Sequence, residues 1–92
     1  MTEKHVHTAH PDVCKRLKRA SGHLQKVIAM IEGQRTCVDI AQQLYAVERA
    51  IGNAKKLVIH DHLDHCLEEV AGAGAVAMRS SMAEFKDITK YL

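Results

Sequence analysis

The sequence has little of what would build a β-sandwich or a membrane protein. It contains one Phe, two Tyr, no Trp and a single Pro, so aromatic residues make up only 3% of the chain. No apolar stretch approaches the roughly 18 residues of a membrane-spanning helix, and the first residues lack the apolar core of a signal peptide. Apolar residues nevertheless make up 47% of the chain, which favours helices packed through aliphatic side chains. We therefore expect an all-α cytoplasmic protein.

The sequence also lacks the features of an enzyme. It shows no Gly-rich phosphate-binding loop and no set of nucleophile, base and acid. Its three cysteines are an odd number, and in a reducing compartment they are not a disulfide framework. They are candidates for metal ligands, reactive thiols or core residues, so each is interpreted separately.

The chain is expected to form one domain. Residues 1–10 are polar and His-rich and predict a mobile arm, whereas residues 11–92 predict a single three-helix domain. Pro11 suits the first position of a helix, and apolar residues then recur at spacings of three and four until Gly33. This pattern predicts a first helix over 11–32.

The second helix is predicted to be unusually long. Thr36 suits its N-cap, and helical apolar spacing continues from residue 37 to 70. A third helix is expected to begin between residues 76 and 82, where Ser81 and Glu84 have the spacing of a capping box. At about 1.5 Å per residue the second helix spans about 50 Å and the first only about 33 Å. The remaining apolar face requires another chain, so a helical dimer or a larger assembly is expected.

Three residues of the second helix suggest a metal site. His62 and Cys66 are four residues apart and therefore share a helix face. Cys37 lies about 37 Å from His62 along the same helix, too far to join them within one chain. Two second helices packed antiparallel, with a two-fold axis near residues 50–51, would bring Cys37 of one chain beside His62 and Cys66 of the other. Two thiolates and an imidazole suit Cu(I) or, with a further nitrogen, Ni(II).

Three segments resemble one protein family: RLKRASGHL at 16–24, CVDI at 37–40 and IHDHLDHC at 59–66. Together they are similar to the copper-sensitive operon repressor (CsoR/RcnR) family over roughly residues 11–92. The resemblance implies a homotetramer, built as a dimer of homodimers without a helix-turn-helix. It also implies a transcriptional repressor that binds operator DNA in the metal-free state. Metal binding would release the DNA and derepress a gene for metal efflux or resistance.

The same resemblance assigns the metal ligands and leaves the metal open. Cys37, His62 and Cys66 match the ligands of the copper branch, so Cu(I) is favoured. The formaldehyde-sensing branch lacks the cysteine at the position of Cys66, and the persulfide-sensing branch lacks the histidine at the position of His62. The nickel branch adds an N-terminal ligand that would fall on His5, which leaves Ni(II), or a related divalent ion, as the alternative.

Glu84 has two interpretations. Copper sensors commonly place a Tyr before the first cysteine, where it hydrogen-bonds with a Glu from the third helix that supports the metal ligands; this chain has Thr36 at that position. Glu84 is therefore either that supporting acid or half of the capping box with Ser81.

Basic residues cluster on the first helix and recur on the second, although the net charge is only +2. A charge run is usually a solvated face, but the resemblance favours DNA, and arginine grips phosphate bidentately. The candidate phosphate contacts are Lys15, Arg16, Lys18, Arg19, Arg49, Lys55 and Lys56. A different class of function, a cytoplasmic metal buffer or chaperone without DNA binding, would use the same metal ligands.

Overall fold

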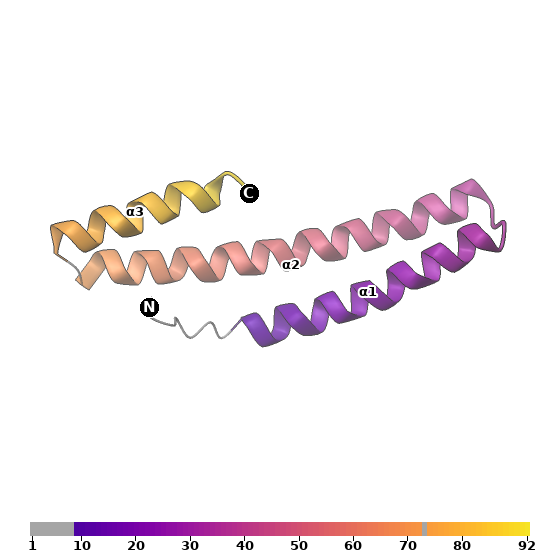
Figure 1. Ribbon diagram of the computed structural model, residues 1–92, viewed down its shortest axis with the longest axis horizontal. Helices are drawn as coiled ribbons and strands as arrows, with labels where there is room; N and C mark the ends of the chain where they lie inside the picture. The colour runs from indigo at the N-terminus through magenta and orange to yellow at the C-terminus, as the bar shows by residue number, and fades with distance from the viewer. Residues whose placement is uncertain (1–8, 73) are drawn as a thin grey trace.

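The computed structural model describes residues 9–72 and 74–92 and contains three helices (Figure 1). These are α1 (His10–Glu32), α2 (Cys37–Gly72) and α3 (Ala75–Thr89), and the described residues include no strand. Helix α1 runs antiparallel to the N-terminal half of α2, and α3 runs antiparallel along its C-terminal part. The molecule is a rod of 59 × 22 × 19 Å. The predicted all-α class is confirmed, and the predicted bounds of the first two helices differ from those observed by two residues at most.

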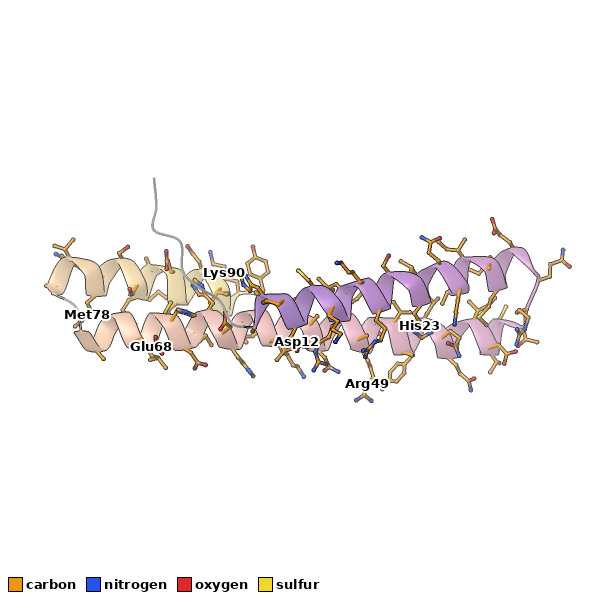
Figure 2. All side chains as sticks on the ribbon, turned by 90° about the horizontal axis from the view of Figure 1, so that it is seen from below. Asp12, His23, Arg49, Glu68, Met78 and Lys90 are labelled. Atoms are coloured by element: carbon orange, nitrogen blue, oxygen red, sulfur yellow. The ribbon has the colours of Figure 1, made fainter. Side chains whose placement is uncertain are left out.

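A seven-residue repeat joins α1 to α2. Val13, Ala20 and Val27 are the buried residues of α1, and on α2 the buried Val47 and Ala54 have the same spacing. A seven-residue apolar repeat is typical of helices that cross at a shallow angle with interlocking side chains. Nε2 of His23 also donates a hydrogen bond of 2.6 Å to Oε1 of Gln43 between the two helices, and Figure 2 shows His23 pointing toward α2.

The apolar surface of α1 is wider than the part that α2 covers. The residues of its predicted apolar stripe that stay exposed in the subunit are Leu17, Leu24, Ile28 and Ile31. On α2, Leu44 and Ile51 are exposed as well. Large contiguous apolar surfaces on a small protein usually mark an interaction site.

The turn between α1 and α2 uses a left-handed residue that is not glycine. Helix α1 ends before Gly33 as predicted, but Gly33 has a φ of −83°, and the positive φ of 60° falls on Gln34. Gln34 N–H donates to the carbonyl of Ile31, and Arg35 N–H donates to the carbonyl of Met30. These two bonds form a Schellman motif, in which the left-handed position after the helix cap is usually a glycine.

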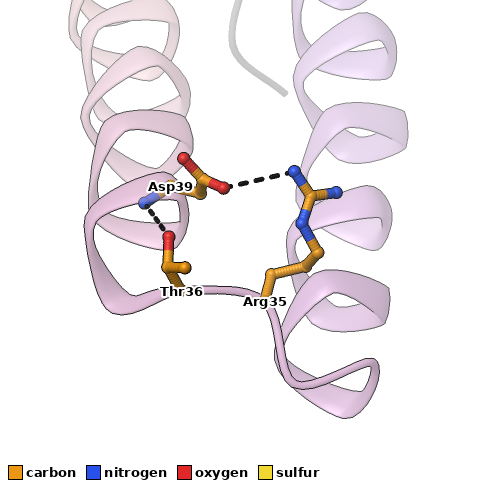
Figure 3. Close-up of polar contacts among 3 residues, drawn as sticks. All are labelled: Arg35, Thr36 and Asp39. Atoms are coloured by element: carbon orange, nitrogen blue, oxygen red, sulfur yellow. Dashed lines mark hydrogen bonds and ion pairs between the residues drawn. The ribbon is translucent and has the colours of Figure 1, made fainter.

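The start of α2 is fixed by side chains (Figure 3). The hydroxyl of Thr36 accepts a hydrogen bond of 3.2 Å from the backbone N–H of Asp39, which confirms Thr36 as the N-cap. Asp39 in turn forms an ion pair of 3.2 Å with Arg35 across the turn. Cys37 is therefore the first residue of a well-capped helix.

The capping box predicted for α3 is wrong. Helix α3 begins at Ala75, one residue before the expected range, because Gly74 adopts an extended conformation and acts as the N-cap. Ser81 and Glu84 both lie inside the helix, and Ser81 is buried. The interpretation of Glu84 as half of a cap is thereby removed.

Candidate metal centre

Helices α2 and α3 bring together three side chains that can bind a metal. His62 and Cys66 lie one turn apart on α2, and the antiparallel return of α3 places Glu84 beside them. One ligand atom from each of the three lies within 4.8 Å of the others, and His62 Nε2 is 3.8 Å from Glu84 Oε2. An imidazole, a thiol and a carboxylate are all established ligands of transition metals.

The centre is buried on one side and open on the other. Cys66 is only 3% exposed, whereas the side chains of His62 and Glu84 are 28% and 54% exposed. The sulfur is therefore the inner ligand, and a metal or a second chain would approach from the side of Glu84. The sequence indicated Glu84 only as a supporting acid or as part of a capping box, because the spacing of residues along the chain does not indicate how α3 packs on α2.

Cys37 is not part of this cluster within the subunit. It is exposed at the first residue of α2, 25 residues before His62, which corresponds to about 37 Å along an unbroken helix. Those 25 residues are almost seven full turns, so Cys37 and His62 lie within about 20° of each other around the axis of α2. Cys66 falls within about 20° on the other side, so the three predicted ligands share one face.

An open apolar groove of about 550 Å³ lies on α2 between Cys37 and His62. Its lining residues are Ala41, Leu44, Tyr45, Val47, Glu48 and Ile51. At about 100° per residue, Ala41, Leu44 and Ile51 lie within about 40° of the Cys37 direction. The groove and the three predicted ligands thus occupy the same face of the helix.

Two neighbouring histidines have other roles. His65 Nδ1 donates a hydrogen bond of 2.9 Å to the backbone carbonyl of Asp61, one turn back on α2, and His60 is exposed. Neither belongs to the cluster of potential ligands among the described residues. His5, the additional ligand expected for nickel, lies outside the described residues.

The candidate phosphate-binding residues are exposed on α1 and α2: Lys15, Arg16, Lys18, Arg19, Arg49, Lys55 and Lys56. Two of them have partners in the subunit. Arg16 forms an ion pair of 2.9 Å with Asp12, a contact that the four-residue spacing could have indicated. The guanidinium of Arg49 lies 5.8 Å from the centre of the Tyr45 ring and projects away from α1 (Figure 2). Arg49 therefore lies beside an aromatic ring while its charge stays accessible.

Cys14, the third cysteine, is exposed near the start of α1. Its thiol is not part of the core of the subunit, nor of the cluster of potential ligands among the described residues.

Known proteins are similar to this chain in sequence, and a solved structure is similar to it in fold. A copper-sensing transcriptional repressor CsoR of Mycobacterium ulcerans (strain Agy99) is 38% identical over 65 residues, which are 68% of this chain and 56% of that protein. The chain thus spans little more than half the length of that relative. CsoR of Bacillus subtilis (strain 168) is 35% identical over 80 residues, 85% of this chain and 79% of the relative. The copper-sensing repressor RicR of Mycobacterium tuberculosis (strain ATCC 25618 / H37Rv) is 31% identical over 85 residues, 91% of this chain and 88% of the relative.

A solved structure, that of the nickel-responsive transcriptional regulator InrS, superimposes with a TM-score of 0.82 at 26% identity. It covers 97% of this chain and 98% of its own. None of the described helices is long and apolar enough to cross a bilayer. The model of the metal-sensitive transcriptional repressor family matches residues 9–91, and its members are repressors rather than enzymes. The chain therefore belongs to the metal-sensitive transcriptional repressor family.

Proposed function

We propose that the protein is a Cu(I)-responsive repressor that binds operator DNA without metal and releases it when Cu(I) binds Cys37, His62 and Cys66. The observation that carries this proposal is the common face of α2. Cys37, His62 and Cys66 lie within about 20° of one direction around the helix, with an apolar groove between them. A second α2 packed antiparallel in that groove joins the two ends of the face.

The three ligands specify which residues of the two α2 helices face each other. If Cys37 meets His62 and Cys66 of the partner subunit, facing residue numbers add up to 99–103, and the two-fold axis passes near residues 50–51. Ile51 then packs near the partner subunit's Ile51. Glu48 and Lys55 lie on the same face of α2. Glu48 of one subunit therefore faces the partner subunit's Lys55 across the interface, and their charges are opposite. An isologous dimer of this kind contains two identical metal sites.

This arrangement removes Lys55 from the residues proposed to contact DNA. Its side chain lies at about the same angle around α2 as Cys37, on the face that the partner would cover. The proposed phosphate contacts are then Lys15, Arg16, Lys18, Arg19, Arg49 and Lys56, all exposed. Dimers that assemble into tetramers repeat this basic surface along a duplex, which raises affinity through the release of counterions.

The donor set favours Cu(I). Two thiolates and one imidazole are soft ligands, and soft ligands select Cu(I). Because Cys37 opens α2 and is held next to the turn by the Thr36 cap, binding at the site ties the turn of one subunit to the C-terminal half of the partner's α2. The subunits then have a metal-bound arrangement that differs from the DNA-binding one. A coupling of about 1–3 kcal/mol between metal and DNA is typical of such regulators.

The test is a DNA-binding titration with and without Cu(I). Fluorescence anisotropy with the promoter of the regulated operon should give salt-sensitive binding by the apo-protein and release on addition of Cu(I). The Cys37→Ser variant should bind the same DNA within about threefold and fail to release it. Release by that variant at the wild-type Cu(I) concentration contradicts the site, and an apo-protein that binds no DNA favours the buffer or chaperone alternative.

A nickel-responsive repressor is the second candidate, supported by the likeness to InrS. Square-planar Ni(II) would need a fourth ligand, and His5 is the residue offered by the sequence. In this case Ni(II) rather than Cu(I) releases the DNA, and the His5→Ala variant loses the response. If the protein instead responds to Cu(I), the His5→Ala variant should release the DNA on addition of Cu(I) as the wild type does.

A further inference from the structure

We propose a second metal-binding mode at the centre, in which His62, Cys66 and Glu84 of one subunit bind a divalent ion such as Zn(II) without Cys37. This mode shares two residues with the proposed copper site but does not depend on the dimer. It uses Glu84 as a ligand rather than as a supporting acid.

The ligand atoms within the subunit are separated by distances near those of a tetrahedral site. Two ligands bound at about 2.0–2.2 Å in a tetrahedral arrangement are separated by roughly 3.4 Å. His62 Nε2 and Glu84 Oε2 are 3.8 Å apart, and the three ligand atoms all lie within 4.8 Å. Small side-chain rotations are sufficient, because Glu84 is exposed and can move toward His62.

The charges and donor types also fit a divalent ion. A Cys66 thiolate and a Glu84 carboxylate supply two negative charges, which balance a dication. A carboxylate oxygen is a common ligand for Zn(II), whereas Cu(I) prefers sulfur. The exposed side of the cluster leaves a fourth position for water. The pair formed by His62 and Cys66 can therefore be completed by Glu84 for Zn(II), or by the partner subunit's Cys37 for Cu(I).

The two helices that supply the ligands are already fixed to each other. Ser81, one turn before Glu84 on α3, is buried, as are Ile59 and Cys66 on α2. The packing of α3 on α2 thus sets the position of the Glu84 backbone before any metal binds. A site that is partly arranged in advance loses less free energy to the ordering of its ligands.

A Co(II) titration of the full-length apo-protein tests this mode, with Co(II) as the spectroscopic substitute for Zn(II). The Cys37→Ser variant should keep both the thiolate-to-cobalt charge-transfer band and the visible bands of tetrahedral cobalt. Its Co(II) and Zn(II) affinities should stay within about threefold of wild type. The Glu84→Gln variant should lose at least tenfold in affinity for both ions, since even residues that only orient ligands contribute 10–100-fold.

Selectivity separates a ligand from a supporting acid. Glu84→Gln should lower Cu(I) affinity less than it lowers Co(II) affinity. Glu84→His should restore the tetrahedral Co(II) bands, and the exposed control Glu68→Gln should match the wild type throughout. Loss of the charge-transfer band in Cys37→Ser overturns the proposal, as does an equal loss of Cu(I) and Co(II) affinity in Glu84→Gln. Failure of the copper proposal gives a different result, namely Cu(I)-driven release of DNA by Cys37→Ser.

Discussion

Truncation of Ile51 should weaken the dimer by an amount that follows from its exposure. Ile51 is 47% exposed in the subunit and lies in the α2 groove near the proposed two-fold axis. Burying a whole aliphatic side chain contributes about 1.5–3 kcal/mol, so burying the exposed half contributes about 1 kcal/mol. The residue occurs twice in an isologous interface, so Ile51→Ala should cost about 2 kcal/mol of dimerisation free energy. That corresponds to roughly a 30-fold higher Kd for the dimer.

Sedimentation velocity over a range of protein concentrations measures this Kd. The matched control is Leu67→Ala, since Leu67 is 60% exposed on the same helix but lies about 160° around the axis from Ile51. This control should leave dimerisation within about threefold of wild type. The reasoning is refuted if Ile51→Ala dimerises like the wild type, or if Leu67→Ala weakens the dimer more than Ile51→Ala does.

Three further predictions concern the register, the DNA surface and the turn. The Lys55→Glu variant should weaken the dimer by about 1 kcal/mol, and adding Glu48→Lys to it should restore the dimer. Sedimentation of the single and the double variant measures both effects, and a double variant that dimerises more weakly than the single one argues against the register. Arg49→Ala should lower the slope of log affinity against log salt by about 0.9 for each subunit that contacts the duplex, whereas the control Lys90→Ala should leave the slope unchanged. Anisotropy at several salt concentrations measures the slope, and the same slope for Arg49→Ala as for the wild type would remove Arg49 from the DNA surface. Gln34→Gly should stabilise the apo-protein by about 1 kcal/mol because Gln34 has a φ of 60°; urea unfolding measures the change, and an unaltered midpoint would show that the turn is not strained.

Local rules predicted most of the fold. Pro11, Thr36 and the run of helical spacing from residue 37 place the helix bounds, because caps and apolar periodicity act over a few residues. The same rules failed at α3, where Ser81 and Glu84 have the spacing of a cap but lie inside the helix. The N-cap of α3 is Gly74, which makes no side-chain cap hydrogen bond, so the helix begins earlier than expected. A Gly N-cap is harder to recognise in a sequence than a Ser or Thr N-cap.

The candidate site could be predicted only in part. The four-residue spacing of His62 and Cys66 places both on one face, and the structure keeps them together. The contact between His62 and Glu84 depends on how α3 packs against α2, which is a tertiary property. The role of Cys37 depends on a second chain, so the sequence indicated it only through the length of the predicted second helix and through the resemblance to the repressor family. Gln34 shows a similar limit on a smaller scale, since nothing in the sequence marked it as the residue with a positive φ.

Complementation between two inactive variants tests most directly the claim that the copper site crosses the subunit boundary. One chain carries Cys37→Ala and the other carries His62→Ala with Cys66→Ala, so neither homodimer has a complete Cys37, His62 and Cys66 set. Mixed dimers, isolated after co-expression with two different tags, combine the Cys37 of one chain with the His62 and Cys66 of the other. The account predicts one Cu(I) of wild-type affinity per mixed dimer in competition with a Cu(I) chelator, and only weak binding by the two parents. Mixed dimers that bind Cu(I) no more tightly than the parents would contradict it.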